Sequence, residues 1–302
     1  MYTPVENKVI SNLIDKLFTA SKWNIGYVWQ TPESLISNKG LHSGISWLKE
    51  DRADYSADPF AIKIDNDVYI YYEELNFWEG KGKIRVIKNL DFKNKETVSG
   101  ILPEGIHLSY PYIFKEASDF YCIPETSEAL EVSLYHLKPE SSIQLQKKRI
   151  LLEGAAYVDS SLIFYKDKYW LFTSISQKKN ELYIFYADTL DGGFTGHALN
   201  PISVESKESR GAGNLFIVDG ELYRPSQNSN HRYGGSIMIN KITQLTENAF
   251  SQKAEFELSP EAPYNMGLHT ISFVNDRIFL DGKRKVYSAF MPLKKMVRRI
   301  RS

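Results

Sequence analysis

The residues of this 302-residue chain best suited to chemistry share one position of a recurring segment. In five copies, that position holds Asp58, Tyr110, Asp159, Ala212 and His269. Two carboxylates, a phenol and an imidazole are more polar than a packed core requires, because burying a polar group is costly. The set therefore predicts a functional site. As an alternative, Asp58 and Asp159 could cap turns or accept hydrogen bonds from backbone amides.

A second set of polar residues lies where the following strand of each copy ends. Carboxylates from neighbouring copies in one pocket could divide the roles of proton donor and base that glycosyl transfer requires. A nearby arginine would keep one carboxylate ionised, whereas burial would raise the pKa of the other. Charged residues at strand ends are also common on solvated surfaces, which is the alternative for each of them. The set consists of Glu73, Glu74, Glu125, Arg224, Gln227, Asn228, Asp281, Lys283 and Arg284.

The loop of residues 208–214, ESRGAGN, adds Arg210 and Asn214 as candidates for ligand binding. Its Gly-Ala-Gly run would let the backbone approach a ligand closely, but it lacks the spacing of a phosphate-binding loop. The six histidines show no zinc-binding spacing, although a propeller could still assemble a zinc site from separate blades. The chain has no G-x-S-x-G motif. The single cysteine, Cys122, lies in a predicted strand. We therefore expect no metal, no cofactor and no nucleophilic serine or cysteine.

The elements that must position these residues are short β-strands. Each copy consists of an apolar strand, a polar turn and an aromatic-rich strand, and the copies begin about fifty residues apart. No helical pattern alternates with the strands, so a parallel α/β sheet is disfavoured. The pattern predicts an all-β chain, a five-bladed β-propeller over residues 23–292. A propeller brings the same position of every blade to one central pocket, and the five residues would then be neighbours.

The two ends of the chain are predicted to lie outside the propeller. Apolar residues recur with helical spacing over residues 5–21, which predicts a short N-terminal helix in an extension of residues 1–22. Residues 23–30 resemble a strand that could close the last blade. Residues 293–302 form a basic tail. This tail is expected to be a solvated terminus or, alternatively, an amphipathic segment that contacts anionic lipid or a partner.

Charge and hydropathy argue against several partners and compartments. Basic and acidic residues each number 37, so no overall field favours nucleic acid. The N-terminus lacks the continuous apolar region of a signal peptide, and nowhere is there an apolar run of about 18 residues. We therefore expect a cytoplasmic location and no nucleic-acid partner.

Several strings resemble the N-terminal domain of plant glucosamine inositolphosphorylceramide transferase and its bacterial relatives. They include ADPFAI, HLSYPYIF, IPET, ADTLDGGFTGHALNPI, RGAGNLF and LYRPSQN, and the resemblance covers roughly residues 44–285. In the plant protein the transferase activity is associated with a separate glycosyltransferase domain. Some bacterial relatives are fused to formyltransferase-like domains or occur with surface-polysaccharide genes. The resemblance therefore implies a glycosyltransferase or a formyltransferase as a protein partner.

The predicted propeller is also similar to that of furanosidase-type glycoside hydrolases. In those enzymes an aspartate in a D-P motif of the first blade is the base or nucleophile, and Asp58 in ADPF matches that position. They carry the acid as a glutamate on a middle blade, which implies Glu125 in IPET or Glu153 in LLEG. A further aspartate usually tunes the acid. The second blade has Tyr110 instead, so only Asp159 of the third blade could take that role.

Two functions follow from the residues and the resemblance. The first is a carbohydrate-active propeller, hydrolase-like or transferase-like, acting on a glycan or glycolipid in surface-polysaccharide assembly or remodelling. Its catalytic residues would be Asp58, Glu125, Glu153 and Asp159. Its substrate-binding residues would be Glu74, Tyr110, Arg210, Asn214, Arg224, Gln227, His269 and Arg284. The alternative is a non-catalytic glycan-binding or scaffold domain that serves a partner glycosyltransferase or formyltransferase.

Overall fold

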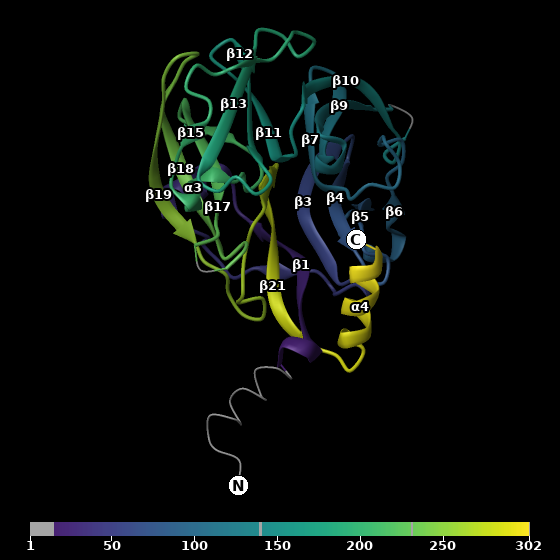
Figure 1. Cartoon of the computed structure of the whole chain (residues 1–302). Coiled ribbons are helices and arrows are strands. Elements are labelled where there is room, and N and C mark those ends of the chain that lie inside the picture. The colour runs from purple at the N-terminus through teal and green to yellow at the C-terminus, as the bar shows by residue number, and fades with distance from the viewer. Residues whose placement is uncertain (1–14, 139–140, 231, 302) are drawn as a thin grey trace.

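The computed structural model describes residues 15–138, 141–230 and 232–301, and these residues are built mainly of β-strands. Figure 1 shows the sheets following one another around the molecule, from blue through teal and green to yellow. The fold is the all-β, five-bladed propeller that the sequence predicts. Within each blade, strands that are consecutive in the chain pair antiparallel, as the short polar turns between them require.

The first two blades have four strands each. The first comprises β3 (Tyr55–Ile64), β4 (Asp67–Leu75), β5 (Gly82–Lys88) and β6 (Glu96–Thr97). The second comprises β7 (Ser109–Glu116), β8 (Asp119–Glu125), β9 (Glu131–Leu137) and β10 (Leu145–Glu153).

The third and fourth blades repeat this order. The third comprises β11 (Tyr157–Tyr165), β12 (Lys168–Ile175) and β13 (Glu181–Ala187), with β14 (Thr195–Gly196) and β15 (Ile202–Ser203) both paired to β13. The fourth comprises β16 (Phe216–Val218), β17 (Glu221–Asn228), β18 (Ser236–Leu245) and β19 (Phe250–Leu258).

The fifth blade is closed by a strand from the N-terminal part of the chain. It contains β20 (Ile271–Val274) and β21 (Arg277–Tyr287), and β1 (Thr19–Trp29) runs antiparallel to β21 from end to end. β2 (Ser46–Trp47) pairs with β1 at the side. A single parallel bridge between Trp23 and Tyr55 joins β1 to β3, so the fifth and first blades share one eight-stranded sheet. The predicted closing strand is confirmed, although it begins at Thr19 rather than at residue 23.

The described helices are short and peripheral. They are α2 (Pro32–Asn38), α3 (Ser206–Ser209), α4 (Met291–Arg301) and the 3-10 helices η1 (Phe92–Asn94) and η2 (Ser127–Ala129). Of the predicted N-terminal helix, residues 15–18 are helical, residues 19–21 belong to β1, and residues 5–14 lie outside the described part of the chain. In the basic tail, the residues up to 301 belong to α4. None of the helices in the described residues has the length and apolarity needed to cross a membrane.

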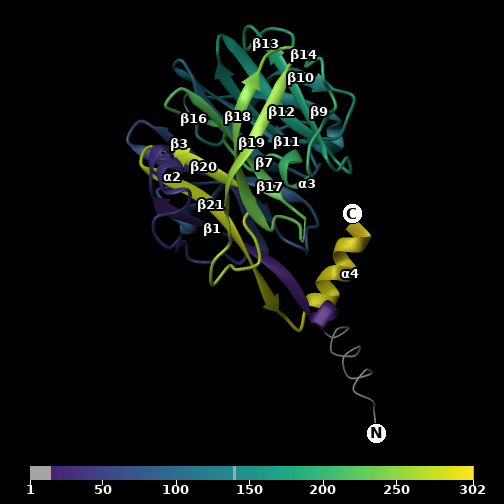
Figure 2. The same cartoon turned by 90° about the vertical axis from the view of Figure 1, so that its left-hand side faces the viewer.

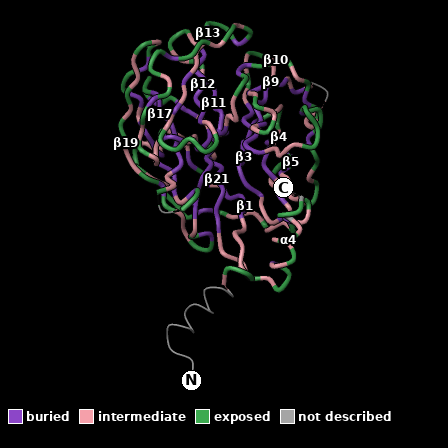
Figure 3. Tube along the Cα trace, in the orientation of Figure 1, coloured by how far each residue is buried: buried purple, intermediate pink, exposed green. Residues whose placement is uncertain are grey.

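Buried apolar side chains pack between neighbouring sheets and hold the inner strands in place. One cluster joins the first three blades through residues such as Phe60, Tyr112, Leu134 and Leu171. Figure 3 shows that the inner strands β3, β11 and β21 are largely buried, whereas the residues of the outer strand β19 are mostly intermediate or exposed. The inner strands therefore form a rigid support for residues at their starts.

We expect the closing strand to be essential for stability. Ile25 of β1 is fully buried, so Ile25→Ala should lower the free energy of unfolding by about 2–5 kcal/mol. Ile217→Ala is the matched control, because Ile217 is an exposed strand residue and should change that free energy by less than about 0.5 kcal/mol. Urea denaturation measures both values, and equal losses would contradict the proposed role of β1.

Candidate functional site

The inner strands of the first three blades share one backbone irregularity, at the position predicted to face the central axis of the propeller. Asp58, Tyr110 and Asp159 have φ angles of 53°, 43° and 53°, the left-handed region that non-glycine residues seldom adopt. Each lies in a break of the strand register, as β-bulges do. Strained residues of this kind persist only where surrounding structure fixes them, and they often mark functional sites.

Carboxylates from the preceding blade fix these three strained residues. The backbone N–H of Asp58 donates to Oδ2 of Asp281 at 2.9 Å. The N–H of Tyr110 donates to Oδ2 of Asp58 at 3.3 Å, and the N–H of Asp159 donates to Oε2 of Glu125 at 3.2 Å. The amide-accepting role foreseen as an alternative for Asp58 is therefore present in the structure, and it orients the carboxylates that define the axis.

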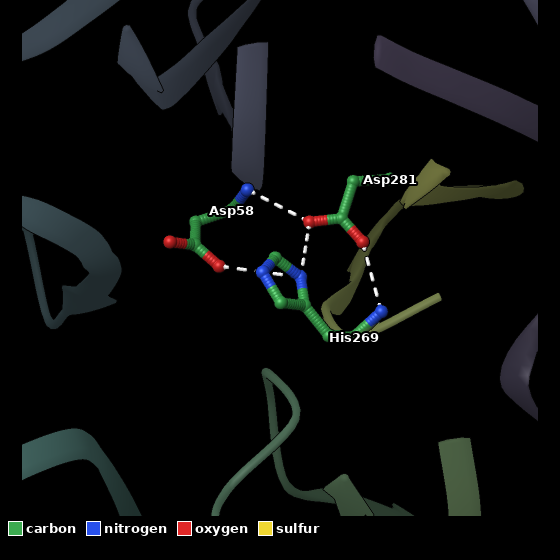
Figure 4. A group of neighbouring side chains, drawn as sticks. All are labelled: Asp58, His269 and Asp281. Atoms are coloured by element: carbon green, nitrogen blue, oxygen red, sulfur yellow. Dashed lines mark hydrogen bonds and ion pairs between the residues drawn. The ribbon is translucent and has the colours of Figure 1, made fainter. Parts of the chain in front are cut away.

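One half of the axial site is a buried histidine between two aspartates (Figure 4). His269 Nδ1 lies 2.6 Å from Asp281 Oδ2 and 3.7 Å from Asp58 Oδ1. The backbone amides of His269 and Thr270 donate to Asp281 Oδ1, and the Thr270 hydroxyl donates to Asp58 Oδ1 at 2.6 Å. The indole of Trp23 stacks on the imidazole, with ring centroids 3.9 Å apart. Position and orientation of the imidazole are thus fixed from several sides.

The charged groups in this half of the site shift one another's pKa values. Burial alone would lower the pKa of His269, but the carboxylates of Asp281 and Asp58 outweigh it and raise that pKa above its ordinary value of 6.5. Burial raises the pKa of Asp58, the charge of His269 opposes this shift, and the charge of Asp281 reinforces it. Asp58, His269 and Asp281 offer ligand atoms within 4.8 Å of one another, a spacing that could also hold a metal ion. When it is protonated, the imidazole places a positive charge between the two carboxylates.

The other half of the axial site is built around Glu125 and Asp159. The guanidinium of Arg210 donates from Nε to Asp159 Oδ2, and the Gln227 amide donates to the same oxygen at 3.3 Å. Burial, followed by the negative charge of Asp159, raises the pKa of Glu125 to about 7, while Arg210 opposes the shift. The Ser127 hydroxyl donates to Glu125 Oε1 at 3.2 Å. Glu125 is therefore a carboxyl group that can carry a proton near neutral pH.

A cavity of about 420 Å³ opens at this second half. Arg210 and Tyr233 line it, with the guanidinium 5.3 Å from the centre of the phenol ring. Lys178 and Lys179 add two further cations, and serine and asparagine side chains complete a polar wall. None of the described residues that line the cavity is acidic. The cavity therefore suits a polar ligand and favours one with negative charge.

The structure brings together seven of the predicted site residues. They are Asp58, Tyr110, Glu125, Asp159, Arg210, Gln227 and His269. Tyr110 is only 1% exposed, and its hydroxyl is shared with Ser161 and with the backbone of Gly213. Its phenol therefore acts as a support between blades rather than as an exposed contact for a sugar.

The remaining predicted residues lie apart from that group. Glu74 forms ion pairs with Arg85 and Lys95. Glu153 is exposed at the end of the outer strand β10, and Arg284 pairs with Glu50. Two more have structural partners. Buried Arg224 donates to the carbonyls of Glu208 and Ser209, and the backbone N–H of Asn214 donates to the Ile271 carbonyl.

Several residues of the site lie outside the predicted set. Asp281 and Arg284 both belong to the strand-end residues, and the sequence favours Arg284 for substrate binding. The structure instead places Asp281 at the axis, where it accepts the Asp58 amide. Trp23 comes from β1, which joins the last blade from a distant part of the sequence. Lys283 donates to the Tyr233 carbonyl beside Trp23, and burial lowers the pKa of this lysine to about 8. No local sequence signal marks these contacts.

Several solved glycoside hydrolases have the same fold. The chain matches an exo-beta-1,3-galactanase from Clostridium thermocellum with a TM-score of 0.54 at 14% identity, covering 69% of this chain and 53% of that one. It matches a family 117 glycoside hydrolase from Zobellia galactanivorans with a TM-score of 0.53 at 12% identity, covering 89% and 91%. A GH43 endo-arabinanase from Bacillus licheniformis gives 0.52 at 16% identity, covering 81% and 98%. At these identities the likeness establishes the propeller fold alone.

Sequence similarity identifies the family. Residues 44–265 match the family model described as glucosamine inositolphosphorylceramide transferase 1, N-terminal, and the chain belongs to this family. It is 32% identical over 224 residues to glucosamine inositolphosphorylceramide transferase 1 of Oryza sativa subsp. japonica, covering 72% of this chain and 29% of the relative. The protein of that name from Arabidopsis thaliana is 29% identical over 218 residues, covering 70% and 28%. The match thus spans less than a third of these relatives.

We expect Asp281 to hold the pKa of His269 above its ordinary value. In Asp281→Asn the nearest negative charge is lost while burial remains, so the pKa of His269 should fall; NMR titration of the ring measures both values. The raised pKa means that protonation stabilises the fold fully below about pH 6.5 and less as pH rises through the higher folded value.

Asp119→Asn is the control for this titration, because Asp119 pairs with His136 at 3.1 Å on the second blade. It should leave the pKa of His269 unchanged. A wild-type His269 that titrates at or below 6.5 would contradict the assigned charge balance.

Proposed function

We propose that this protein is a carbohydrate-active propeller that binds a glycan or glycolipid in the cavity beside Arg210 and Tyr233 and acts on a glycosidic bond there. One observation carries the proposal: Glu125, whose pKa is raised to about 7, accepts the backbone N–H of Asp159, and Asp159 pairs with Arg210, which lines a cavity of ligand size. Perturbed carboxyl groups at a concave polar site are typical of acid–base catalysis.

The proposed chemistry divides the axial carboxyl groups by role. Glu125 gives its proton to the glycosidic oxygen as the bond from that oxygen to the anomeric carbon breaks. Asp58, oriented by the Tyr110 amide and the Thr270 hydroxyl, serves as the base or nucleophile. Asp159, paired with Arg210, raises the pKa of Glu125 so that it holds its proton until the substrate binds.

The proposed substrate carries a negative charge. Lys178, Lys179 and Arg210 line the cavity, and no acidic residue is among the described residues of its wall. The matched relatives are named glucosamine inositolphosphorylceramide transferase 1, and that name includes a phosphorylated lipid. An anionic saccharide should therefore bind more tightly than its neutral counterpart, and this preference should weaken with salt.

A second candidate function is non-catalytic glycan binding in the service of a partner glycosyltransferase or formyltransferase. The observation that favours it is the structural use of the carboxylates, since Asp58 and Glu125 each accept a backbone amide from the next blade. Binding of a glycan without turnover by the wild-type protein would select this function over the first.

We expect Glu125→Gln to abolish most of the turnover on an anionic glycan panel. The amide keeps an oxygen that can accept the Asp159 N–H but cannot donate an acidic proton, so kcat should fall by about 10²–10⁴-fold with little change in binding. Reducing-end release measures kcat, and calorimetry measures the dissociation constant.

Glu153→Gln is the matched control, because Glu153 is an exposed glutamate on an outer strand of the same blade. Its turnover should equal that of the wild type. If both variants retain wild-type turnover, Glu125 is not the acid, and if Glu153→Gln alone loses it, the roles of the two are reversed.

The pH dependence of kcat/KM should report the proton on Glu125. Because Glu125 must be protonated and its pKa is about 7, kcat/KM should decline as pH rises through about 7. In Asp159→Asn one cause of the raised pKa is removed, so the decline should move to lower pH. A profile that stays level through pH 8 in the wild type would contradict this assignment.

A further inference from the structure

The C-terminal helix α4 turns an apolar face away from the propeller. Phe290, just before the helix, is 67% exposed, and Leu293, Met296 and Ile300 are 45%, 54% and 77% exposed. Their spacing places them along one side of a helix with 3.6 residues per turn. A soluble helix usually packs such a side against its own protein, but the described part of the chain leaves this side exposed.

The opposite side of α4 is anchored to the propeller. The helix is therefore held in one orientation, and its apolar face stays directed outward. Met291 is 2% exposed and packs in a cluster with Leu75 and Phe77. Lys294 Nζ pairs with both carboxylate oxygens of Asp54, at 2.8 and 3.1 Å. Lys295 Nζ donates to the carbonyl of Thr19 at 2.7 Å. Figure 2 shows the anchored helix standing beside the sheets, next to the start of β1.

Further apolar side chains extend the exposed face at the same end of the molecule. The Ser288 amide donates to the Phe18 carbonyl at 2.9 Å, which joins the end of β21 to the start of β1. Leu17, Phe18 and Tyr287, which flank this contact, are 43%, 36% and 68% exposed. The surface formed by these three residues together with Phe290, Leu293, Met296 and Ile300 is called the α4 face below.

The charge of the helix indicates what covers this face. Five of the eleven residues of α4 are basic and none is acidic, whereas the whole chain has equal numbers of both. Arg299, which is exposed, follows the anchored lysines on the polar side of the helix. An exposed apolar face beside dense positive charge complements an anionic lipid surface, where apolar side chains enter the boundary layer and basic ones contact headgroups.

We propose that the α4 face binds the surface of an anionic lipid bilayer. The helix lies on the membrane and does not cross it, because eleven residues span about 16 Å at 1.5 Å per residue, roughly half the apolar thickness of a bilayer. This binding would hold the propeller at a membrane surface. It stands on the helix alone and does not depend on the proposed chemistry at the axis.

Flotation with lipid vesicles tests this proposal. The full chain should float with phosphatidylcholine vesicles that contain phosphatidylglycerol and much less with phosphatidylcholine alone, and added salt should release it. In the triple variant Leu293→Ser, Met296→Ser and Ile300→Ser, the apparent partition coefficient should fall by roughly tenfold or more. The three positions are exposed, so circular dichroism and thermal unfolding should show an intact propeller.

The matched control replaces three apolar residues of similar exposure elsewhere, Phe164→Ser, Leu199→Ser and Ile217→Ser. This control should float like the wild type. Failure of the wild-type protein to bind either kind of vesicle overturns the proposal. So does a helix variant that floats normally but changes from dimer to monomer in sedimentation velocity, since the α4 face would then join two copies of the chain.

Discussion

The propeller axis depends on one repeated interaction, a hydrogen bond from a strained backbone amide to a carboxylate of the preceding blade. Asp281 accepts the amide of Asp58, Asp58 that of Tyr110, and Glu125 that of Asp159. A buried N–H without an acceptor would cost about 1–3 kcal/mol, and each left-handed residue adds strain of its own. The carboxylates are therefore needed for the fold before any chemistry is considered, and the fold in turn fixes their orientation.

Placing several carboxylates on one axis creates repulsion, and the structure relieves it unequally. Asp281 lies against the imidazole of His269, and Asp159 lies against the guanidinium of Arg210. Among the described residues no ion pair is formed by Glu125, so burial and the charge of Asp159 outweigh the opposing charge of Arg210 and raise the pKa of this glutamate to about 7. This inequality leaves one carboxyl group able to exchange a proton near neutral pH, joined through Asp159 to Arg210 on the cavity wall.

The repeat was enough to predict the fold and the axial residues, because the strand pattern within a copy and the spacing between copies are both visible in the sequence. It placed Asp58, Asp159 and His269 together across more than two hundred residues of chain. The strand-end set was less predictable. Neighbouring residues of a strand face opposite sides, and Glu74 pairs with Arg85 instead of facing the axis. Whether Asp281 or Arg284 faces the axis depends on the register of β21. The contribution of Trp23 depends on closure of the ring by β1, which no local pattern encodes.

Tyr110 shows how one substitution in the axial ring changes the chemistry available. A carboxylate at this position would add a further negative charge to the axis, whereas the phenol accepts the Gly213 amide at 2.7 Å and bonds to Ser161 at 2.9 Å. The second blade therefore uses its axial position to hold the third and fourth blades. Its carboxyl group comes instead from Glu125, at the end of β8 and only partly buried. That carboxylate accepts the Asp159 amide, and Asp159 pairs with Arg210 on the cavity wall, so this blade is joined to the cavity through Glu125 rather than through its enclosed phenol.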